Sequence, residues 1–270
     1  MKLVDNLKEV FKHRLLIRTL VSRELKARYR GTVLGFFWSF FNPFLLMVVY
    51  TVVFGFIIPA RDESIGKPLA YAVFLFSGLL PWTWFSSSSN DSANVLMVNG
   101  NLIKKIMFPA EVLPIVSVTS NFVHFLFGLP ILLVFLILFG KPLTAYIFLF
   151  PIVVLVQYVF TLGFSLLISS LTVHFRDIKD ILSNLLTFWF FSTPIIYSFG
   201  SSVFKDRPEF QRILSFNPMT HIFTAYQDCF FFGRLFHWKR LGITFLVGLI
   251  LFWIGYAVFD RLRDSFPEEV

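Results

Sequence analysis

Side chains that could act as acids, bases or metal ligands are sparse and scattered in this sequence. The five histidines lie at positions 13, 124, 174, 221 and 237, and their spacing is not that of a metal site. Neither a GxSxG nor an HExxH motif occurs. A single cysteine, Cys229, excludes an internal disulfide and a cysteine metal cluster. We therefore expect no metal ion and no catalytic residue in this chain.

A nucleotide site of the P-loop kind is also absent from the sequence. Its backbone amides cradle phosphates only when two glycines lie five positions apart before Lys-Ser/Thr. The Gly-Lys pairs, Gly66-Lys67 and Gly140-Lys141, are each followed by proline and lack the earlier glycine. If this protein moves a solute with ATP, a separate subunit must hydrolyse it.

Polar side chains inside the apolar segments are equally few. His124, Gln157 and Asn184 lie within them, and Asp91, Glu111, Asp180 and Asp260 lie at their ends, where they can reach water. An ionisable group at membrane depth is costly and usually functional. A single histidine is nevertheless more often hydrogen-bonded to a neighbouring helix than part of a proton relay. Proton coupling therefore has weak support.

The composition places these residues in a membrane protein. Of the 270 residues, 56% are hydrophobic and 15% are charged, and the mean hydropathy is +0.74. Soluble domains have about 45–50% apolar and about 25% charged residues. The net charge of +8 does not indicate nucleic acid, because many basic residues flank apolar runs. The first such run begins near Val33, too far along the chain for a cleavable signal.

The apolar pattern predicts an all-α membrane protein with six transmembrane helices. A spanning helix needs about 20 apolar residues, and six segments qualify: 33–58, 69–91, 112–139, 143–172, 180–199 and 241–260. Fifteen of the 24 Lys and Arg residues would lie on the side that holds both termini. By the positive-inside rule both termini are then cytoplasmic.

The N-terminal residues 1–30 predict an amphipathic helix. Leu7, Phe11 and Leu15 recur every four residues, and the spacing continues through Ile17, Val21, Leu25 and Tyr29, while basic residues lie largely on other faces. Such a helix lies in the headgroup plane as a topology anchor. Alternatively, its polar face docks a cytoplasmic partner; periodicity alone favours the anchor.

Two connecting segments are also unusual. Residues 99–111 mix apolar side chains with Lys104 and Lys105, which fits either a short helix that offers apolar contacts to a partner or an ordinary interfacial loop. Residues 200–240 contain pieces too short to span, 208–215 and 217–233. Pro208 suits a helix start and Gly233 a helix stop, so we expect two short external or re-entrant helices there.

Aromatic residues make up 19% of the chain, and 38 residues are Phe. Most of them should pack in the core or face lipid. Trp82, Trp84 and Phe85 follow Pro81, and Tyr197 follows Pro194, so these four could form a smooth wall along which sugar rings slide.

Five stretches resemble the type 2 ABC exporter permeases, within the branch that exports lipid-linked polysaccharide such as O-antigen, capsule or teichoic acid. They are ELKARYRGTVLGFFWSFFNP (24–43), GLLPWTWF (78–85), VHFRDIKDI (173–181), STPIIY (192–197) and FNPMT (216–220). The resemblance covers nearly the whole chain in order and spacing. The basic form R/K-x-R-Y-R-G-x-x-L-G-x-x-W is nearer to the O-antigen permeases than to the teichoic acid ones.

The resemblance implies six spans per subunit and a homodimer that works with two copies of a separate P-loop ATPase. That partner would bind ATP and magnesium, and no cofactor is implied for this chain. The resemblance also implies that the N-terminal helix and a coupling helix over 99–111 contact the ATPase. The contacts would then be made by Arg18, Arg23, Lys26, Lys104, Lys105, Phe108 and Glu111.

The implied substrate is an undecaprenyl-diphosphate-linked glycan, exported across the bacterial plasma (inner) membrane. Arginine pairs with phosphate bidentately, so Arg28, Tyr29 and Arg30 are placed to receive the diphosphate at the cytoplasmic mouth. Spans one and five would line a conduit between protomers, with 200–240 beside its exit. The conduit candidates are Phe37, Trp38, Phe41, Trp82, Trp84, Phe85 and Tyr197.

A hinge is expected where the basic segment meets the first span. Gly31 would form the corner, and Asn42-Pro43 would lie about 13 Å into the span at 1.5 Å per residue. Proline there frees a backbone carbonyl and favours a kink. The stretch would thus join an ATPase-facing helix to the conduit wall.

Other functions stay open at this point. A type 2 permease could carry another cargo, such as teichoic acid, a drug or a small lipid. A membrane enzyme acting on polyprenyl lipids would need carboxylates or histidines clustered at one interface, and these are scattered here. A passive channel would not associate with an ATPase.

Overall fold

The computed structural model describes residues 13–53, 57, 65, 68–104, 108–141, 143–201 and 208–270. Within these residues the chain is helical and has no strand. The helices of the first half are α2 (Arg14–Arg28), η1 (Gly35–Phe37), α3 (Trp38–Val52), α4 (Pro68–Val98), α5 (Gly100–Ile103) and α6 (Val112–Leu138). Those of the second half are η3 (Ala145–Leu149), α7 (Phe150–His174), α8 (Ile178–Phe191), α10 (Pro208–Ser215), α11 (Pro218–Gln227), η4 (Asp228–Phe232), α12 (Trp238–Leu262), η5 (Arg263–Ser265) and α13 (Phe266–Glu269).

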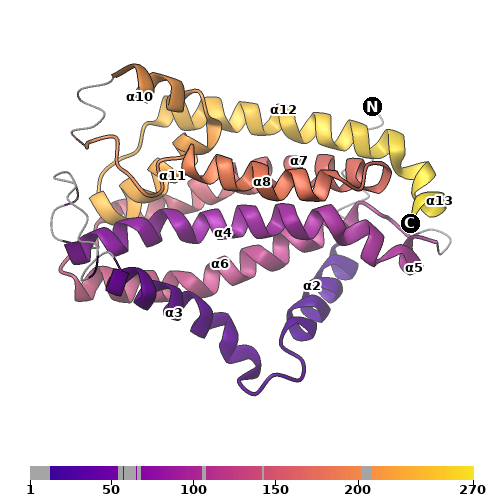
Figure 1. Ribbon diagram of the computed structural model, residues 1–270, viewed down its shortest axis with the longest axis horizontal. Helices are drawn as coiled ribbons and strands as arrows, with labels where there is room; N and C mark the ends of the chain where they lie inside the picture. Colours follow the sequence, from indigo (N-terminus) through magenta and orange to yellow (C-terminus); the bar gives the residue numbers. More distant parts are fainter. Residues whose placement is uncertain are drawn as a thin grey trace.

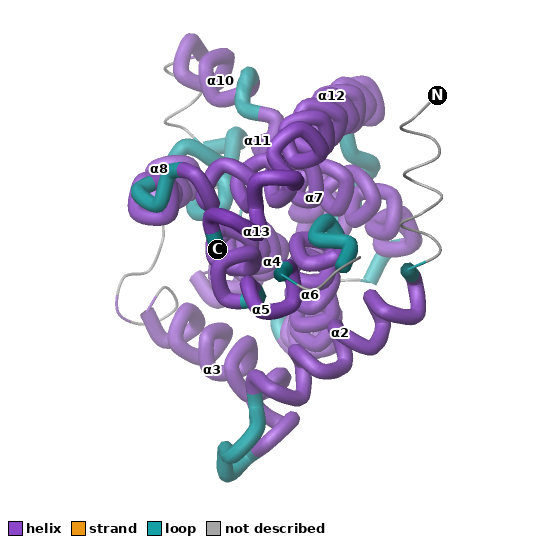
Figure 2. Tube along the Cα trace, turned by 90° about the vertical axis from the view of Figure 1, so that its right-hand side faces the viewer, coloured by secondary structure: helices purple, strands orange, loops and turns teal. Residues whose placement is uncertain are grey.

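The long helices α4, α6, α7, α8 and α12 run along the longest axis of the molecule (Figure 1). The short helices α5 and α13 lie together at one end, while α10 and α11 lie toward the other (Figures 1 and 2). Helix α3 diverges from the bundle, and α2 turns back toward it, so that the two form a V. The segments expected to be cytoplasmic and external are therefore at opposite ends.

Helix α4 forms the centre of the bundle. Every described side chain from Ala70 to Trp82 is buried, because α4 packs against α3, α6, α7, α8 and α11. A helix that is apolar on all sides is expected in such a central position. Its first half is therefore isolated from lipid as well as from water.

Helices α7 and α12 pack against each other at two glycines. A Cβ on Gly163 of α7 would lie 2.5 Å from the backbone nitrogen of Phe252 on α12, and a Cβ on Gly255 would clash with the Gly163 carbonyl. Small residues allow helix backbones to approach closely where no hydrophobic force drives association. Among the described elements, α7 and α12 share the most extensive contact.

The expected spans differ from the helices in two respects. Helices α6, α7 with η3, α12 and η1–α3 are long and apolar enough to cross a membrane by length and composition. Helix α8 has 14 residues and ends at Phe191 rather than near 199, because the turn before Pro194 stops it. At 1.5 Å per residue it covers about 21 Å, less than the about 30 Å of a hydrocarbon core. Helix α4, with 31 residues, extends beyond the expected 69–91 to Val98. The count of six spans stays a prediction.

The two short helices expected between 200 and 240 are present as α10 and α11. Pro208 begins α10, and the Asn217 side chain caps α11 by accepting a hydrogen bond from the Met219 amide at 3.1 Å. Gly233 ends the following turn with a left-handed φ of 60°. The start and stop signals read from the sequence are thus confirmed; that the helices re-enter the membrane stays a prediction.

The glycine contact between α7 and α12 leads to a test of stability. Gly163→Ala should lower the free energy of unfolding by about 1–3 kcal/mol, because backbone on α12 cannot move aside for the new methyl group. Thermal unfolding of the purified protein in detergent measures this loss. Gly242→Ala is the matched control, since a Cβ there meets nothing within 4 Å. Equal melting temperatures for both variants would contradict the close approach.

Candidate functional site

The end of α2 is tied to α4 and α6 through the guanidinium group of Arg28. It donates hydrogen bonds to Asp91 Oδ2 at 3.0 Å and to Asn121 Oδ1 at 3.3 Å, and it lies 3.9 Å from Glu24 Oε1. Asn121 Nδ2 donates to the same Asp91 oxygen at 2.8 Å. We name these four residues the Arg28 cluster. Because Asp91 is on α4 and Asn121 on α6, the cluster joins three helices.

The electrostatics of the Arg28 cluster depend on the positive charge of Arg28. Burial and the nearby Asp91 carboxylate raise the pKa of Glu24, while Arg28 opposes that rise. Two carboxylates close to each other need a cation between them. Arg28 is therefore already paired within the chain, and its guanidinium is only partly available to a phosphate.

Tyr29 provides a second link from the same turn to α6. Its hydroxyl lies 3.3 Å from His124 Nδ1, and the two rings meet edge to face with centroids 5.7 Å apart. The expected hydrogen bond from His124 to a neighbouring segment is confirmed. Tyr29 is half-buried, so this contact also limits its access to a ligand.

The apolar side of α2 packs against the first turns of α6. Val21 contacts the cluster of Val112 and Val116, with Ile17 and Leu25 beside it. Leu15 was expected on this face, but it is 75% exposed. Leu15 lies off the apolar face because that face follows the 3.6-residue repeat of the helix, whereas a strict four-residue series drifts away from it. Residues 1–12, with Leu7 and Phe11, lie outside the described part of the chain.

The corner after α2 has the backbone expected of a turn. Gly31 has a φ of 78° and Gly35 a φ of 50°, both in the left-handed region. The Thr32 hydroxyl donates to the Tyr29 carbonyl at 2.8 Å, which closes the turn between them. Arg30 is exposed here, and its side chain has no hydrogen-bond or ion-pair partner among the residues the structure describes. Of the three residues predicted to receive a diphosphate, Arg30 is the most accessible.

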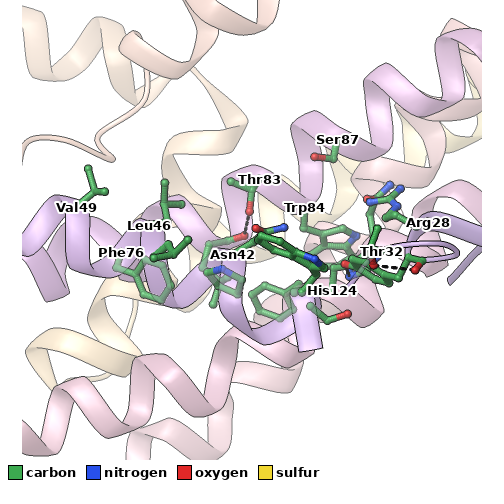
Figure 3. Close-up of a pocket in the computed structure, with 18 residues that line it drawn as sticks. Arg28, Thr32, Asn42, Leu46, Val49, Phe76, Thr83, Trp84, Ser87 and His124 are labelled. Atoms are coloured by element: carbon green, nitrogen blue, oxygen red, sulfur yellow. Dashed lines mark hydrogen bonds between the residues drawn. The ribbon is translucent and has the colours of Figure 1, made fainter. Parts of the chain in front are cut away.

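A cleft of about 810 Å³ opens between α3, α4 and α6 (Figure 3). Arg28, Thr32 and His124 lie along one part of it, and Asn42, Leu46 and Phe76 along another. Pro43 is inside α3 and also lines the cleft. Two of the predicted diphosphate residues, Arg28 and Tyr29, therefore share one cavity with the predicted hinge residues Asn42 and Pro43, although they come from separate segments; Arg30 does not line it.

The aromatic conduit candidates fall into two groups. Trp82, Trp84 and Phe85 are 6%, 2% and 0% exposed. Their rings pack on others of the same chain; for example, Trp84 stacks on Phe125 at 5.3 Å and Phe85 meets Trp189 at 5.4 Å. In this structure they form part of the core.

The other conduit candidates are more accessible. Phe37 is 72% exposed and Phe41 is 38% exposed, both near the start of the first span. Trp38 and Tyr197 are half-buried, and the Tyr197 hydroxyl donates to the Phe191 carbonyl at 3.1 Å. The accessible conduit candidates of the first span therefore belong to η1 and α3.

The residues predicted to contact an ATPase are at the same end of the molecule. Arg18, Arg23 and Lys26 are exposed on α2, and Lys104 is exposed after α5. Phe108 and Glu111 are half-buried just before α6. Lys105 lies outside the described residues. The helix expected over 99–111 is described only as the four-residue α5, so we refer to residues 99–111 as the coupling segment.

Three members of the Arg28 cluster are not identified as site residues from the sequence, and Glu24 appears only within the quoted stretch 24–43. Asp91 was noted only as a residue at a span end, and Asn121 was not singled out. An amide side chain such as that of Asn121 within an apolar span can be noticed in the sequence, because a buried polar group needs a hydrogen-bond partner. Which partner it has depends on the helix packing. Among the described residues, no group of three or more His, Cys, Asp or Glu side chains could hold a metal ion.

A model of the ABC-2 type transporter family matches residues 15–231, which is most of the chain. The chain belongs to the ABC-2 type transporter family. The matched region includes the Arg28 cluster, the cleft and the coupling segment.

Three relatives of this ABC-2 transporter chain carry informative names. An O-antigen export system permease protein of Myxococcus xanthus is 38% identical over 263 residues, which cover 97% of this chain and 98% of the relative. One of the same name in Klebsiella pneumoniae is 32% identical over 94% of each chain. The polysialic acid transport protein of Escherichia coli is 22% identical over 92% of this chain and 93% of that protein.

The Arg28 cluster of this ABC-2 transporter can be tested by a double-mutant cycle. Asp91→Asn should lower the free energy of unfolding by about 1 kcal/mol, since the ion pair is only partly buried. Arg28→Gln should remove most of the same contribution, so the two losses should not add. Asp264→Asn is the control, because Asp264 is 94% exposed beside Arg263. Additive losses from Asp91→Asn and Arg28→Gln would contradict the link.

Proposed function

We propose that this chain is the transmembrane subunit of an ATP-driven exporter that moves lipid-linked, O-antigen-like polysaccharide out of the cytoplasm. The observation that carries the proposal is end-to-end similarity to an O-antigen export permease, 38% identical with 97% of this chain covered. Such coverage leaves no large part of the chain to serve another activity.

In this proposal the energy comes from a separate ATPase that binds ATP and magnesium. The absence of a P-loop from the sequence supports it. The complex would contain two copies of this chain and two of the ATPase. The exposed cations Arg18, Arg23 and Lys26 and the described residues of the coupling segment would form the surface for that partner, since they lie toward the same end of the molecule.

Movement would reach the bundle through α2. When the partner closes on ATP, it displaces α2, and the Arg28 cluster passes that displacement to α4 and α6 as a rigid unit. The turn at Gly31 would allow α3 to rotate through a different angle from α2. Membrane-spanning segments thereby separate and rejoin around the polymer, with α3 changing its distance from α4.

The diphosphate of the substrate would enter beside Arg30 and the cleft lined by Arg28 and Thr32. The glycan would then follow exposed aromatic side chains of α3 and α8 between the two copies. On α8 the exposed residues Ile181, Leu185, Phe188 and Phe191 form one apolar stripe. Aromatic faces suit this path because they contact many sugar rings without holding any one hydroxyl.

The topology that fits this function has six spans in the bacterial inner membrane with both termini cytoplasmic. Helices α10 and α11 would then lie at the outer face beside the exit. Their position at the end opposite to α5 and α13 supports this placement (Figure 1).

Reconstitution of this chain with its ATPase in proteoliposomes tests the proposed function. Undecaprenyl-diphosphate-linked O-antigen should stimulate ATP hydrolysis and be exported, whereas a drug or a small lipid should do neither. A response to a teichoic acid alone would assign a different cargo. No response to any polymer would overturn the polysaccharide proposal.

The diphosphate contact has a separate test. Arg30→Gln should reduce glycan-stimulated ATP hydrolysis about tenfold, because a charge-assisted hydrogen bond contributes about 1.5–3 kcal/mol. The melting temperature should not change, since the Arg30 side chain is exposed. Arg212→Gln, an exposed arginine on α10, should leave the stimulation intact. Equal stimulation in the wild type and in Arg30→Gln would remove Arg30 from the substrate site.

A further inference from the structure

We propose that the segment from Arg263 to Val270 positions the described ends of the coupling segment, so that force from the ATPase is transmitted to the bundle. This inference rests on the proposed function for the claim that an ATPase supplies the force. The contact itself is a property of the chain alone. Phe266 is the central positioning residue.

Phe266 anchors the segment in a hydrophobic cluster separate from the main core. It is 0% exposed, and its ring meets that of Phe259 on α12 edge to face with centroids 5.1 Å apart. The ring of His174, at the end of α7, lies 6.3 Å away. The chain therefore turns back after α12 and inserts an aromatic side chain between α12 and α7.

The same cluster contains both described ends of the coupling segment. Ile103 belongs to it on one side and Ala110 on the other, and Phe108 packs against it. Phe266 thus shares a core with the residue that ends α5 and with residues that precede α6. We name this group, with Phe259 of α12, the end cluster.

A polar contact holds the turn before Phe266 in place. The Ser265 hydroxyl donates to the Leu262 carbonyl at 2.7 Å. Its oxygen therefore accepts from His174 Nε2, which lies 3.0 Å away. This bond joins η5 to the end of α7, so the segment is attached by a hydrogen bond as well as by apolar packing.

The last residue of the sequence contacts α5 directly. A Cβ added to Gly100 would lie 3.3 Å from Val270 Cγ2 and 3.5 Å from its carbonyl carbon. The Val270 amide donates to the Phe266 carbonyl at 3.1 Å, which sets its position. Both views of the molecule place α5 and α13 side by side at one end (Figures 1 and 2).

A short element such as α5 needs this support. A four-residue helix has too few hydrogen bonds to offset the cost of nucleation, so its conformation depends on tertiary packing. The packing comes from the end cluster and from Val270. Because α7 and α12 are themselves joined at Gly163 and Gly255, the end cluster connects the coupling segment to the most closely packed helix pair.

Truncation of Phe266 in the assembled complex separates positioning from simple stability. In proteoliposomes with the ATPase, Phe266→Ala should still assemble and hydrolyse ATP, but the glycan exported per ATP should fall about fivefold, within the range of measured coupling changes. Phe266→Leu should restore most of this ratio, because it refills the end cluster. Ile250→Ala truncates an apolar side chain of α12 that is 59% exposed, and it should leave the ratio unchanged.

Amide hydrogen exchange of the isolated permease provides a readout that needs no substrate. In Phe266→Ala, exchange of residues 100–104 should become faster, while α10 should be unaffected. The positioning role would be overturned by unchanged exchange at residues 100–104 or by an unchanged export ratio. A parallel loss of export, hydrolysis and assembly would also overturn it. Failure of the wild-type pair to export glycan would instead reject the proposed function, and the exchange measurement would still decide this inference.

Discussion

The burial of the first half of α4 on all sides is the constraint on which the rest of this structure depends. A helix in hydrocarbon satisfies its own backbone hydrogen bonds, so the remaining question is what its side chains contact. Over most of the length of α4 the side chains contact other helices of the protein, and its serines Ser77, Ser88 and Ser89 are buried among them. That requirement places the helices around it. Helix α3 contacts the bundle less extensively than α6 and α7 do. It therefore diverges from the bundle, and the cleft opens between α3, α4 and α6.

Two attachments of different chemistry connect α2 and the coupling segment to this bundle. The Arg28 cluster is polar and partly exposed, so its strength depends on geometry and on the charge of Asp91. The end cluster is apolar and buried, so its strength depends on volume and not on salt. If the proposed function holds, α2 transmits movement through a polar contact that salt can weaken, and the coupling segment through an apolar contact that salt does not affect.

Several individual features were predictable from the sequence because they depend on local chemistry. The corner at Gly31, the start of α11 at Asn217-Pro218 and the end of η4 at Gly233 follow from backbone preferences of those residues. The length of α8 was not predictable in the same way. Its apolar pattern continues past Phe191, and only the turn that precedes Pro194 ends the helix.

The sequence by itself determined that the chain is a helical membrane protein without a P-loop motif, and its motifs indicated the permease family, since composition, periodicity and motif spacing depend on neighbouring residues. The tertiary structure alone decided which side chains meet. Trp84 and Phe41 are both aromatic residues in apolar segments, yet one is in the core and the other is exposed. Arg28 and Asp91, 63 residues apart, form an ion pair, and Phe266 reaches the coupling segment from far along the chain. Such contacts depend on how helices pack, and a one-dimensional pattern does not contain that information.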